Sequence, residues 1–216
     1  MKRNQSGFTL IEIAIVLVII GLLLGGVLKG QELINSARVK NLANDFKNIP
    51  VYIYGYQDKF KALPGDDVAA VAHVSATAIG DGNGIINGMW DSVTATDESV
   101  IFWQHVRLAN LAPGETAVNL TTYLPTNAVG GRIGITNATA ANLPITGLRG
   151  SYIICSRSIL GKFARQIDTT LDDGNTTTGS VMVMADQTPP AAVPAAAVAS
   201  TVAGFDDTPY TVCMGF

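Results

Sequence analysis

The chain has 216 residues, a formal net charge of -3 and a positive mean hydropathy. Only 14% of its residues are charged and 48% are hydrophobic, which excludes disorder over most of its length. A pI of about 5.3 and the lack of a Lys/Arg cluster argue against nucleic-acid binding. Two cysteines are too few for a disulfide-dense scaffold or a four-cysteine zinc site.

The two parts of the chain differ in charge. Residues 1–61 hold eight Lys/Arg and four Asp/Glu, whereas residues 62–216 hold six and thirteen. A basic first part followed by an acidic second part predicts two different environments along one chain.

Residues 8–28 form an apolar stretch in which Glu12 is the only charged residue. As a helix, this stretch would span roughly 31 Å, about the thickness of a bilayer core. We therefore predict a membrane span, with a long buried core helix as the alternative. Lys2 and Arg3 precede the stretch, so the positive-inside rule places the N-terminus in the cytoplasm and exports the rest. No small-residue signal-peptidase site follows the stretch, so we expect it to be retained.

Residues 29–61 continue the helical periodicity with apolar residues on one face, which predicts an amphipathic helix with one buried stripe. Pro50 lacks a backbone donor and should break or kink this helix, which then resumes over residues 51–60. The expected total length is some 45–55 residues.

Residues 62–216 should form an exported globular head. Strands are expected at residues 131–136, 148–155, 180–184 and 210–214, and short helices at residues 97–111 and 158–171. Residues 66–96 are expected to be irregular loop, and the Pro/Ala/Val-rich residues 188–204 to be an exposed extended loop.

The start of the apolar stretch carries a specific motif. The chain opens with a short basic leader, and Gly7 is followed by Phe8, with Glu12 at the fifth position counted from Phe8. This pattern resembles the class III signal of the type IV pilin and type II secretion pseudopilin superfamily. The resemblance implies that residues 1–7 are a leader cleaved after Gly7 by a prepilin peptidase/methyltransferase, and that Phe8 is then N-methylated.

The same resemblance implies an α+β, pilin-like lollipop. A long N-terminal helix would pack on an antiparallel β-sheet head that has short helices and long loops. Residues 8–28 would cross the membrane and later form the filament core, and residues 29–61 would be the amphipathic half of the helix. The implied location is the bacterial inner membrane, single-pass with a periplasmic head, followed by a pilus or pseudopilus.

Glu12 has two interpretations. A carboxylate inside a membrane costs about 2.5–3.5 kcal/mol, so it needs a partner or a position near the interface. The first interpretation is an interfacial residue that reaches water. The second, which the resemblance supports, is an assembly residue that pairs with the new α-amino group of Phe8 on a neighbouring subunit.

Cys155 and Cys213 fall in two predicted strands. The resemblance favours a disulfide between them, since many pilins carry a C-terminal bridge. Such a bridge would close a loop of roughly 59 residues and contribute about 4 kcal/mol by the chain-entropy argument. Two free buried thiols are the alternative.

Motifs for enzymatic chemistry are missing from the sequence. His73 and His105 belong to no zinc-hydrolase motif, and no nucleophile elbow or phosphate loop is present, so we expect no enzyme and no cofactor. We expect His105 to serve in packing or hydrogen bonding. Calcium is the one metal to consider, and its weak candidate ligands are Asp81, Asn83, Asp172 and Asp173, which Asp66 and Asp67 could join.

The function expected from these observations is that of a structural subunit. It would form homo- or hetero-polymers with other pilin-like subunits, with the help of an inner-membrane assembly platform, and its head could serve in adhesion or secretion. The sequence leaves major pilin, minor pilin and pseudopilin open. The alternative is a membrane-tethered periplasmic module that binds calcium or another ligand and does not polymerise.

Overall fold

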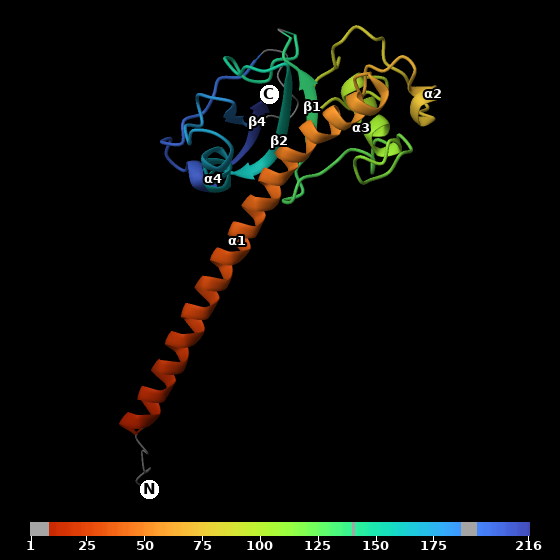
Figure 1. Cartoon of the computed structure of the whole chain (residues 1–216). Helices are drawn as coiled ribbons and strands as arrows, with labels where there is room; N and C mark the ends of the chain where they lie inside the picture. The colour runs from red at the N-terminus through yellow and green to blue at the C-terminus, as the bar shows by residue number, and fades with distance from the viewer. Residues whose placement is uncertain (1–8, 140, 187–193) are drawn as a thin grey trace. The chain divides into compact units, whose positions relative to one another are not determined.

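The computed structural model describes residues 9–139, 141–186 and 194–216. The chain divides into two compact units, residues 1–38 and 39–216, each described by itself below. Helix α1, Leu10–Phe60, contributes residues to both units, and the four strands belong to the second (Figure 1). The length of α1, 51 residues, lies in the expected range.

In the second unit, the last turns of α1 supply one wall of the core. The buried residues of this helix recur three or four positions apart and are Val39, Leu42, Ala43, Phe46, Ile49, Ile53 and Tyr56. Of the break or kink expected at Pro50, the break is wrong, because the helix continues through this residue. Ile49 and Ile53 are buried on either side, and their packing compensates for the hydrogen bond that Pro50 cannot donate.

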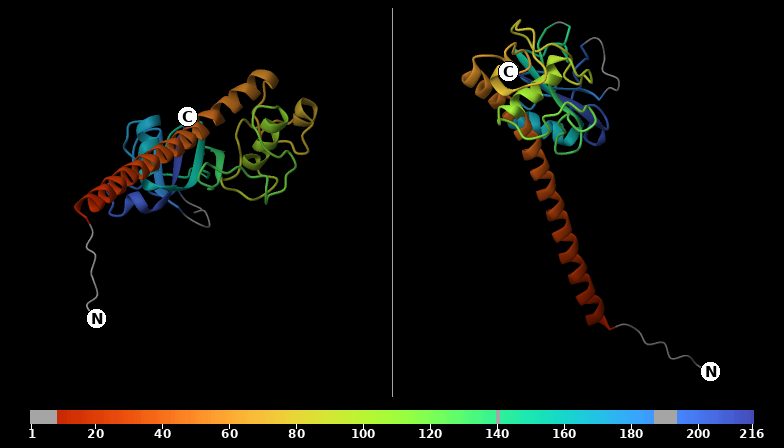
Figure 2. Two further views of the ribbon diagram at one scale, coloured as in Figure 1. Left: turned by 90° about the horizontal axis from the view of Figure 1, so that it is seen from below. Right: turned by 90° about the vertical axis from the view of Figure 1, so that its right-hand side faces the viewer.

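The sheet is antiparallel with the strand order β1-β2-β4-β3, and its members are β1 Ile133–Asn137, β2 Tyr152–Leu160, β3 Val181–Ala185 and β4 Pro209–Gly215. Both faces are covered. Ile135, Ile154 and Val212 pack with residues of α1 in one cluster. Ile153 and Met182 point to the opposite face, where Trp90, Ile145 and Leu148 cover them. Figure 2 shows from two further sides that residues 39–60 lie along one face only.

The fold confirms an α+β architecture with a long N-terminal helix on a four-stranded antiparallel sheet. Short helices complete it: α2 Ala70–Val74, α3 Glu98–Leu108, α4 Gly161–Leu171 and the 3₁₀ turn η1 Phe205–Asp207. Helix α2 lies in the stretch expected to be irregular, so that expectation is wrong for five residues. Ala70, its one buried residue, supplies too little apolar pattern to be recognised.

The boundary between β2 and α4 also differs from the expectation. Residues 158–160 are strand rather than the first turn of a helix, because β2 continues through a bulge between Ser156 and Ile159. Ser158 takes a φ of 62° there. Helix α4 begins at Gly161, where a Cβ atom would lie 1.9 Å from the carbonyl oxygen of Phe205. Glycine is therefore required by this close approach.

The described part of the Pro/Ala/Val-rich stretch, residues 194–204, is not a fully exposed loop. Ala195 forms a bridge with Ile145, and Ala197 forms one with Met184 at the edge of β3. Both alanines pack against the apolar cluster on the face opposite α1. The small side chains of this alanine-rich segment therefore cover the edge of the sheet at β3.

Candidate functional site

The start of α1 is held by a reciprocal capping arrangement. The backbone N–H and the hydroxyl of Thr9 both donate to Oε2 of Glu12 at 2.8 Å, and the N–H of Glu12 contacts the Thr9 hydroxyl oxygen at 3.3 Å. This is a capping box, in which an N-cap threonine and a glutamate three residues later satisfy each other. Glu12 is exposed, and Gly7 and Phe8 lie outside the described residues.

The apolar stretch after Thr9 has no cover in the first unit. Every residue from 9 to 29 is exposed, and Leu10 is exposed to 89%. The helix is long and apolar enough to cross a membrane, and nothing lies within 4 Å of the Cβ positions of Gly21, Gly25, Gly26 and Gly30. So large an apolar surface requires lipid or another protein chain against it.

Asp81 and Asn83, two of the calcium candidates, lie beside two acids from elsewhere in the chain. Carboxylate oxygens of Asp66, Asp81 and Glu98 come within 4.8 Å of one another. Asp66 accepts the backbone N–H groups of Gly82, Asn83 and Gly84 at 2.6–3.0 Å. Backbone donors thus already occupy both oxygens of Asp66.

Glu98 is satisfied in the same way. Its two oxygens accept the N–H groups of Asp81 at 2.9 Å and Asn87 at 2.8 Å. Burial raises the pKa of Glu98, and these two bonds oppose the rise. The Glu98 carboxylate therefore holds the loop 80–88 against α3 through the hydrogen bonds that it accepts.

Asp172 and Asp173, the other candidates, join a third acid that the sequence interpretation missed. Carboxylate oxygens of Asp168, Asp172 and Asp173 also lie within 4.8 Å of one another. Asp168 lies in the last turns of α4 and Asp172 directly follows the helix, a four-residue spacing that brings the two close together and could have revealed the group. The structure therefore places Asp66 and Asp81 in one group and Asp172 and Asp173 in another, and it places Asp67 in neither.

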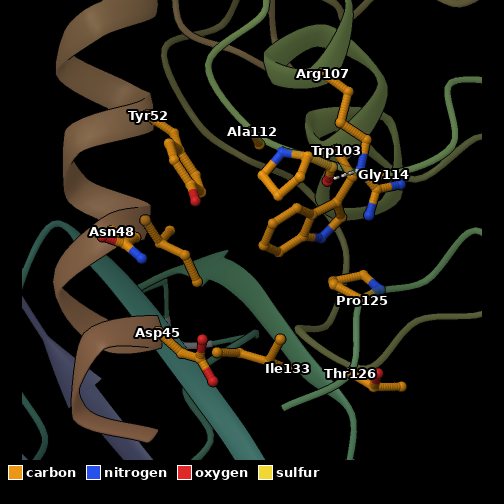
Figure 3. A pocket seen from close by; sticks show the side chains of 12 residues that line it. Asp45, Asn48, Tyr52, Trp103, Arg107, Ala112, Gly114, Pro125, Thr126 and Ile133 are labelled. Carbon is orange, nitrogen blue, oxygen red and sulfur yellow. Dashed lines mark hydrogen bonds between the residues drawn. The ribbon is translucent and has the colours of Figure 1, made fainter. Parts of the chain in front are cut away.

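A pocket of about 330 Å³ lies between α1, α3 and the loop that follows α3 (Figure 3). Asp45 and Tyr52 of α1 face Trp103 and Arg107 of α3 across it. Burial raises the pKa of Asp45 to about 6, and the backbone N–H of Ala128 opposes the rise. The pocket offers aromatic surface and one carboxyl group. It was not predicted, because three segments distant in sequence form it.

Arg107 shows that part of this pocket is structural. Its Nε donates to the carbonyl oxygen of Pro113 at 3.2 Å, and its Nη1 donates to those of Glu115 at 2.9 Å and Tyr123 at 2.7 Å. The guanidinium therefore holds the loop after α3 in place.

The remaining predicted residues have structural roles. Cys155 and Cys213 form the expected disulfide. His105 is fully buried; its Nδ1 accepts the N–H of Gly65 at 3.0 Å and its Nε2 lies 3.0 Å from the carbonyl oxygen of Ala78. Burial lowers the pKa of His105, and the expected role in packing and hydrogen bonding is confirmed. His73 contacts Asp67 at 2.7 Å.

Comparison with known proteins identifies one part of the chain. Residues 2–28 match the prokaryotic N-terminal methylation motif, which marks precursors of type IV pilins and pseudopilins with a class III signal. No curated protein and no solved structure matches the chain. The motif implies processing by a prepilin peptidase.

Proposed function

We propose that this chain, a pilin-like structural protein with a prepilin methylation motif rather than an enzyme, assembles into a type IV pilus or a type II secretion pseudopilus. The apolar N-terminal helix and the motif indicate anchoring in the inner membrane before assembly. The observation that carries the proposal is the exposure of every residue from 9 to 29.

Polymerisation would replace lipid around this segment by identical or related helices. Such helices gain no hydrophobic energy on leaving lipid, so packing and polar contacts must drive their association. The glycines at positions 21, 25, 26 and 30 leave room for close approach of a neighbouring helix.

Glu12 would add the polar contact. Its hydrogen bonds with Thr9 use Oε2, so Oε1 can accept a bond from the α-amino group of Phe8 on a neighbouring subunit after cleavage. In a filament core of low dielectric constant, this ion pair is stronger than in water. A subunit that slipped along the axis would leave Glu12 charged and unpaired, which is costly.

The test is to express the full chain with a prepilin peptidase and an assembly platform, and to analyse both membranes and material sheared from cells. We expect a mature chain that begins with N-methylated Phe8, present in filaments in the sheared fraction. Gly7→Val, which places a bulky residue at the cleavage site, should block cleavage and filament formation. A chain that retains residues 1–7, or that begins well downstream of residue 28, would contradict the proposal.

A membrane-tethered binding module is the second candidate, and the pocket lined by Asp45, Tyr52 and Trp103 favours it. Such a module would use the apolar helix only as a membrane anchor, and this helix would not have to pack against other subunits. Mature protein found only in membranes, with no filaments in the sheared fraction of cells that assemble other pilins, would favour this module.

A further inference from the structure

The end of α4 carries an acidic side chain in an unusual state. Asp168 is fully buried, and neither of its carboxylate oxygens has a hydrogen-bond partner among the described residues. Buried carboxylates are normally hydrogen-bonded or paired, since an isolated buried charge is very costly. Burial, together with the charges of Asp173 and Asp172, raises the pKa of Asp168 to about 6, and the nearby Gly174 N–H opposes this rise without being hydrogen-bonded to the carboxylate.

The carboxylates of two more acids lie close to that of Asp168. Oxygens of Asp168, Asp172 and Asp173 lie within 4.8 Å of one another. Oδ2 of Asp172 is held by the N–H groups of Ser180 at 2.6 Å and Val181 at 2.9 Å. The loop before β3 therefore fixes the position of Asp172 instead of letting it turn into solvent.

Asp173 is positioned by its own loop. Its Oδ1 accepts the N–H of Asn175 at 2.8 Å, and its Oδ2 contacts the Thr178 hydroxyl at 3.3 Å. Asp172 and Asp173 are both more exposed than Asp168, so an ion from solvent can reach the group.

The electrostatic surroundings are those of an incomplete cation site. The C-terminal end of a helix carries partial negative charge, and the last turn of α4 contains no basic residue. Among the described residues, no ion pair reaches any of the three acids. Three carboxyl groups at the negative end of a helix repel one another unless a cation or a proton compensates.

The other acidic group of the head differs in this respect. Asp66 and Glu98 are also buried, yet backbone N–H groups satisfy all four of their carboxylate oxygens. In this protein, three acids within reach of one another therefore do not by themselves indicate a cation site. The unpartnered Asp168 is what distinguishes the second group.

We propose that Asp168, Asp172 and Asp173 bind a divalent cation of the calcium type, which links the end of α4 to the loop that precedes β3. All three side chains offer oxygen ligands, the type that hard cations prefer, and the group contains no histidine or cysteine that would favour zinc. Water and backbone carbonyl groups of the loop would complete the coordination. With three side-chain ligands and an accessible position, we expect a dissociation constant of roughly 10⁻⁴ M, in the range of extracellular calcium modules.

The test uses the full chain in detergent micelles, stripped with EDTA and titrated with calcium chloride by calorimetry. Thermal unfolding is measured in parallel in EDTA and in 10 mM calcium. We expect one calcium per chain and a rise in Tm of about 5–10 °C, because a ligand at 100 times its dissociation constant stabilises the folded state. Asp168→Asn and Asp173→Asn should each weaken binding at least tenfold, whereas Asp81→Asn in the other acidic group should bind as the wild type does.

A second readout separates ligation from folding. In EDTA, Asp168→Asn should unfold at a temperature no lower than the wild type, because it removes an uncompensated buried charge; in calcium, the wild type should be the more stable. Should Asp168→Asn fail to fold, the exposed Asp173→Asn decides alone. The proposal is overturned if the wild type shows no saturable calcium binding, if Asp173→Asn binds unchanged, or if only Asp81→Asn loses binding.

Discussion

Cys155 on β2 lies directly opposite Cys213 on β4, and the two form a disulfide on the sheet face that does not contact α1. The bridge joins two neighbouring strands of the sheet, of which β4 is the last in the chain. Because the cysteines are 58 positions apart, the bridge restricts the unfolded chain considerably.

Removal of this bridge should destabilise the head. We expect the double variant Cys155→Ala/Cys213→Ala to lower Tm by roughly 10 °C, since a loop of this size contributes about 4 kcal/mol. Mass spectrometry after alkylation checks the bridge itself. Unreduced wild-type protein should take up no label, and two labelled thiols without reductant would refute the pairing.

Tyr56 should anchor α1 to the loop after it. Its hydroxyl donates to Oδ2 of Asp67 at 2.7 Å, and both residues are buried. Burial and the neighbouring Asp67 carboxylate raise the pKa of Tyr56, so the hydroxyl stays a donor. Tyr56→Phe leaves the carboxylate short of a partner, and we expect a loss of about 1–3 kcal/mol in the free energy of unfolding.

The control for this variant is Tyr54→Phe. Tyr54 lies on the same helix but is 59% exposed, so its hydroxyl should contribute less than about 0.5 kcal/mol. Denaturant unfolding of both variants provides the comparison. Equal losses for Tyr54→Phe and Tyr56→Phe would show that the bond to Asp67 contributes nothing specific.

Asp45 should make the head more stable in mild acid than at neutral pH. Burial raises the pKa of Asp45 to about 6 from a usual value of 3.8, so the folded state holds an extra proton between these pH values. This contribution is fully present below about pH 4 and is lost as the pH rises through about 6. Asp45→Asn, which stays neutral, should have a Tm close to that of the wild type at pH 4 and a higher Tm above pH 6.

Thermal unfolding between pH 4 and pH 7 checks this prediction. Asp58→Asn, at a side chain that is 90% exposed, is the matched control and should follow the wild type throughout. A constant difference in Tm between Asp45→Asn and the wild type at every pH would exclude titration of this carboxyl group as the cause.

Glu12 should be needed for assembly through its charge rather than through its cap. Glu12→Ala removes both functions, whereas Glu12→Gln keeps a side chain that can complete the capping box with Thr9. We expect both variants to be cleaved normally and both to lose most filaments in the sheared fraction. Thr9→Ala weakens the cap by about 1 kcal/mol but keeps the carboxylate, so it should still form filaments. Normal filaments from Glu12→Ala would reject the assembly role.

Gly134 should tolerate no side chain. A Cβ at this position of β1 would lie 1.9 Å from the carbonyl oxygen of Trp90, a backbone atom that cannot move aside cheaply. Gly134→Ala should therefore lower Tm by several degrees or prevent folding. Gly55→Ala in α1 meets only the flexible side chain of Leu111, at 3.2 Å, and should be neutral or stabilising because alanine favours helix. Unfolding of the two variants side by side tests the contrast.

The sequence alone determined the N-terminal part of this protein. The membrane-length helix and the methylation motif depend on composition and on residues within a few positions of one another, so they are readable without a fold. The strands of the sheet were recognisable for the same reason, since runs such as residues 181–184 are apolar throughout. The capping box of Thr9 and Glu12 is equally local and was readable, although the sequence interpretation did not include it.

Only the tertiary structure decided what depends on distant segments. In the sequence, Asp168 is indistinguishable from the other polar residues of an amphipathic helix. Its burial beside Asp172 and Asp173 follows from the packing of α4 against the loop before β3. The sequence could not show whether Asp66 is a metal ligand, because only the structure shows that the N–H groups of residues 82–84 donate to its carboxylate. The physical reason is that burial and hydrogen-bond satisfaction are set by long-range packing, which residue spacing does not encode.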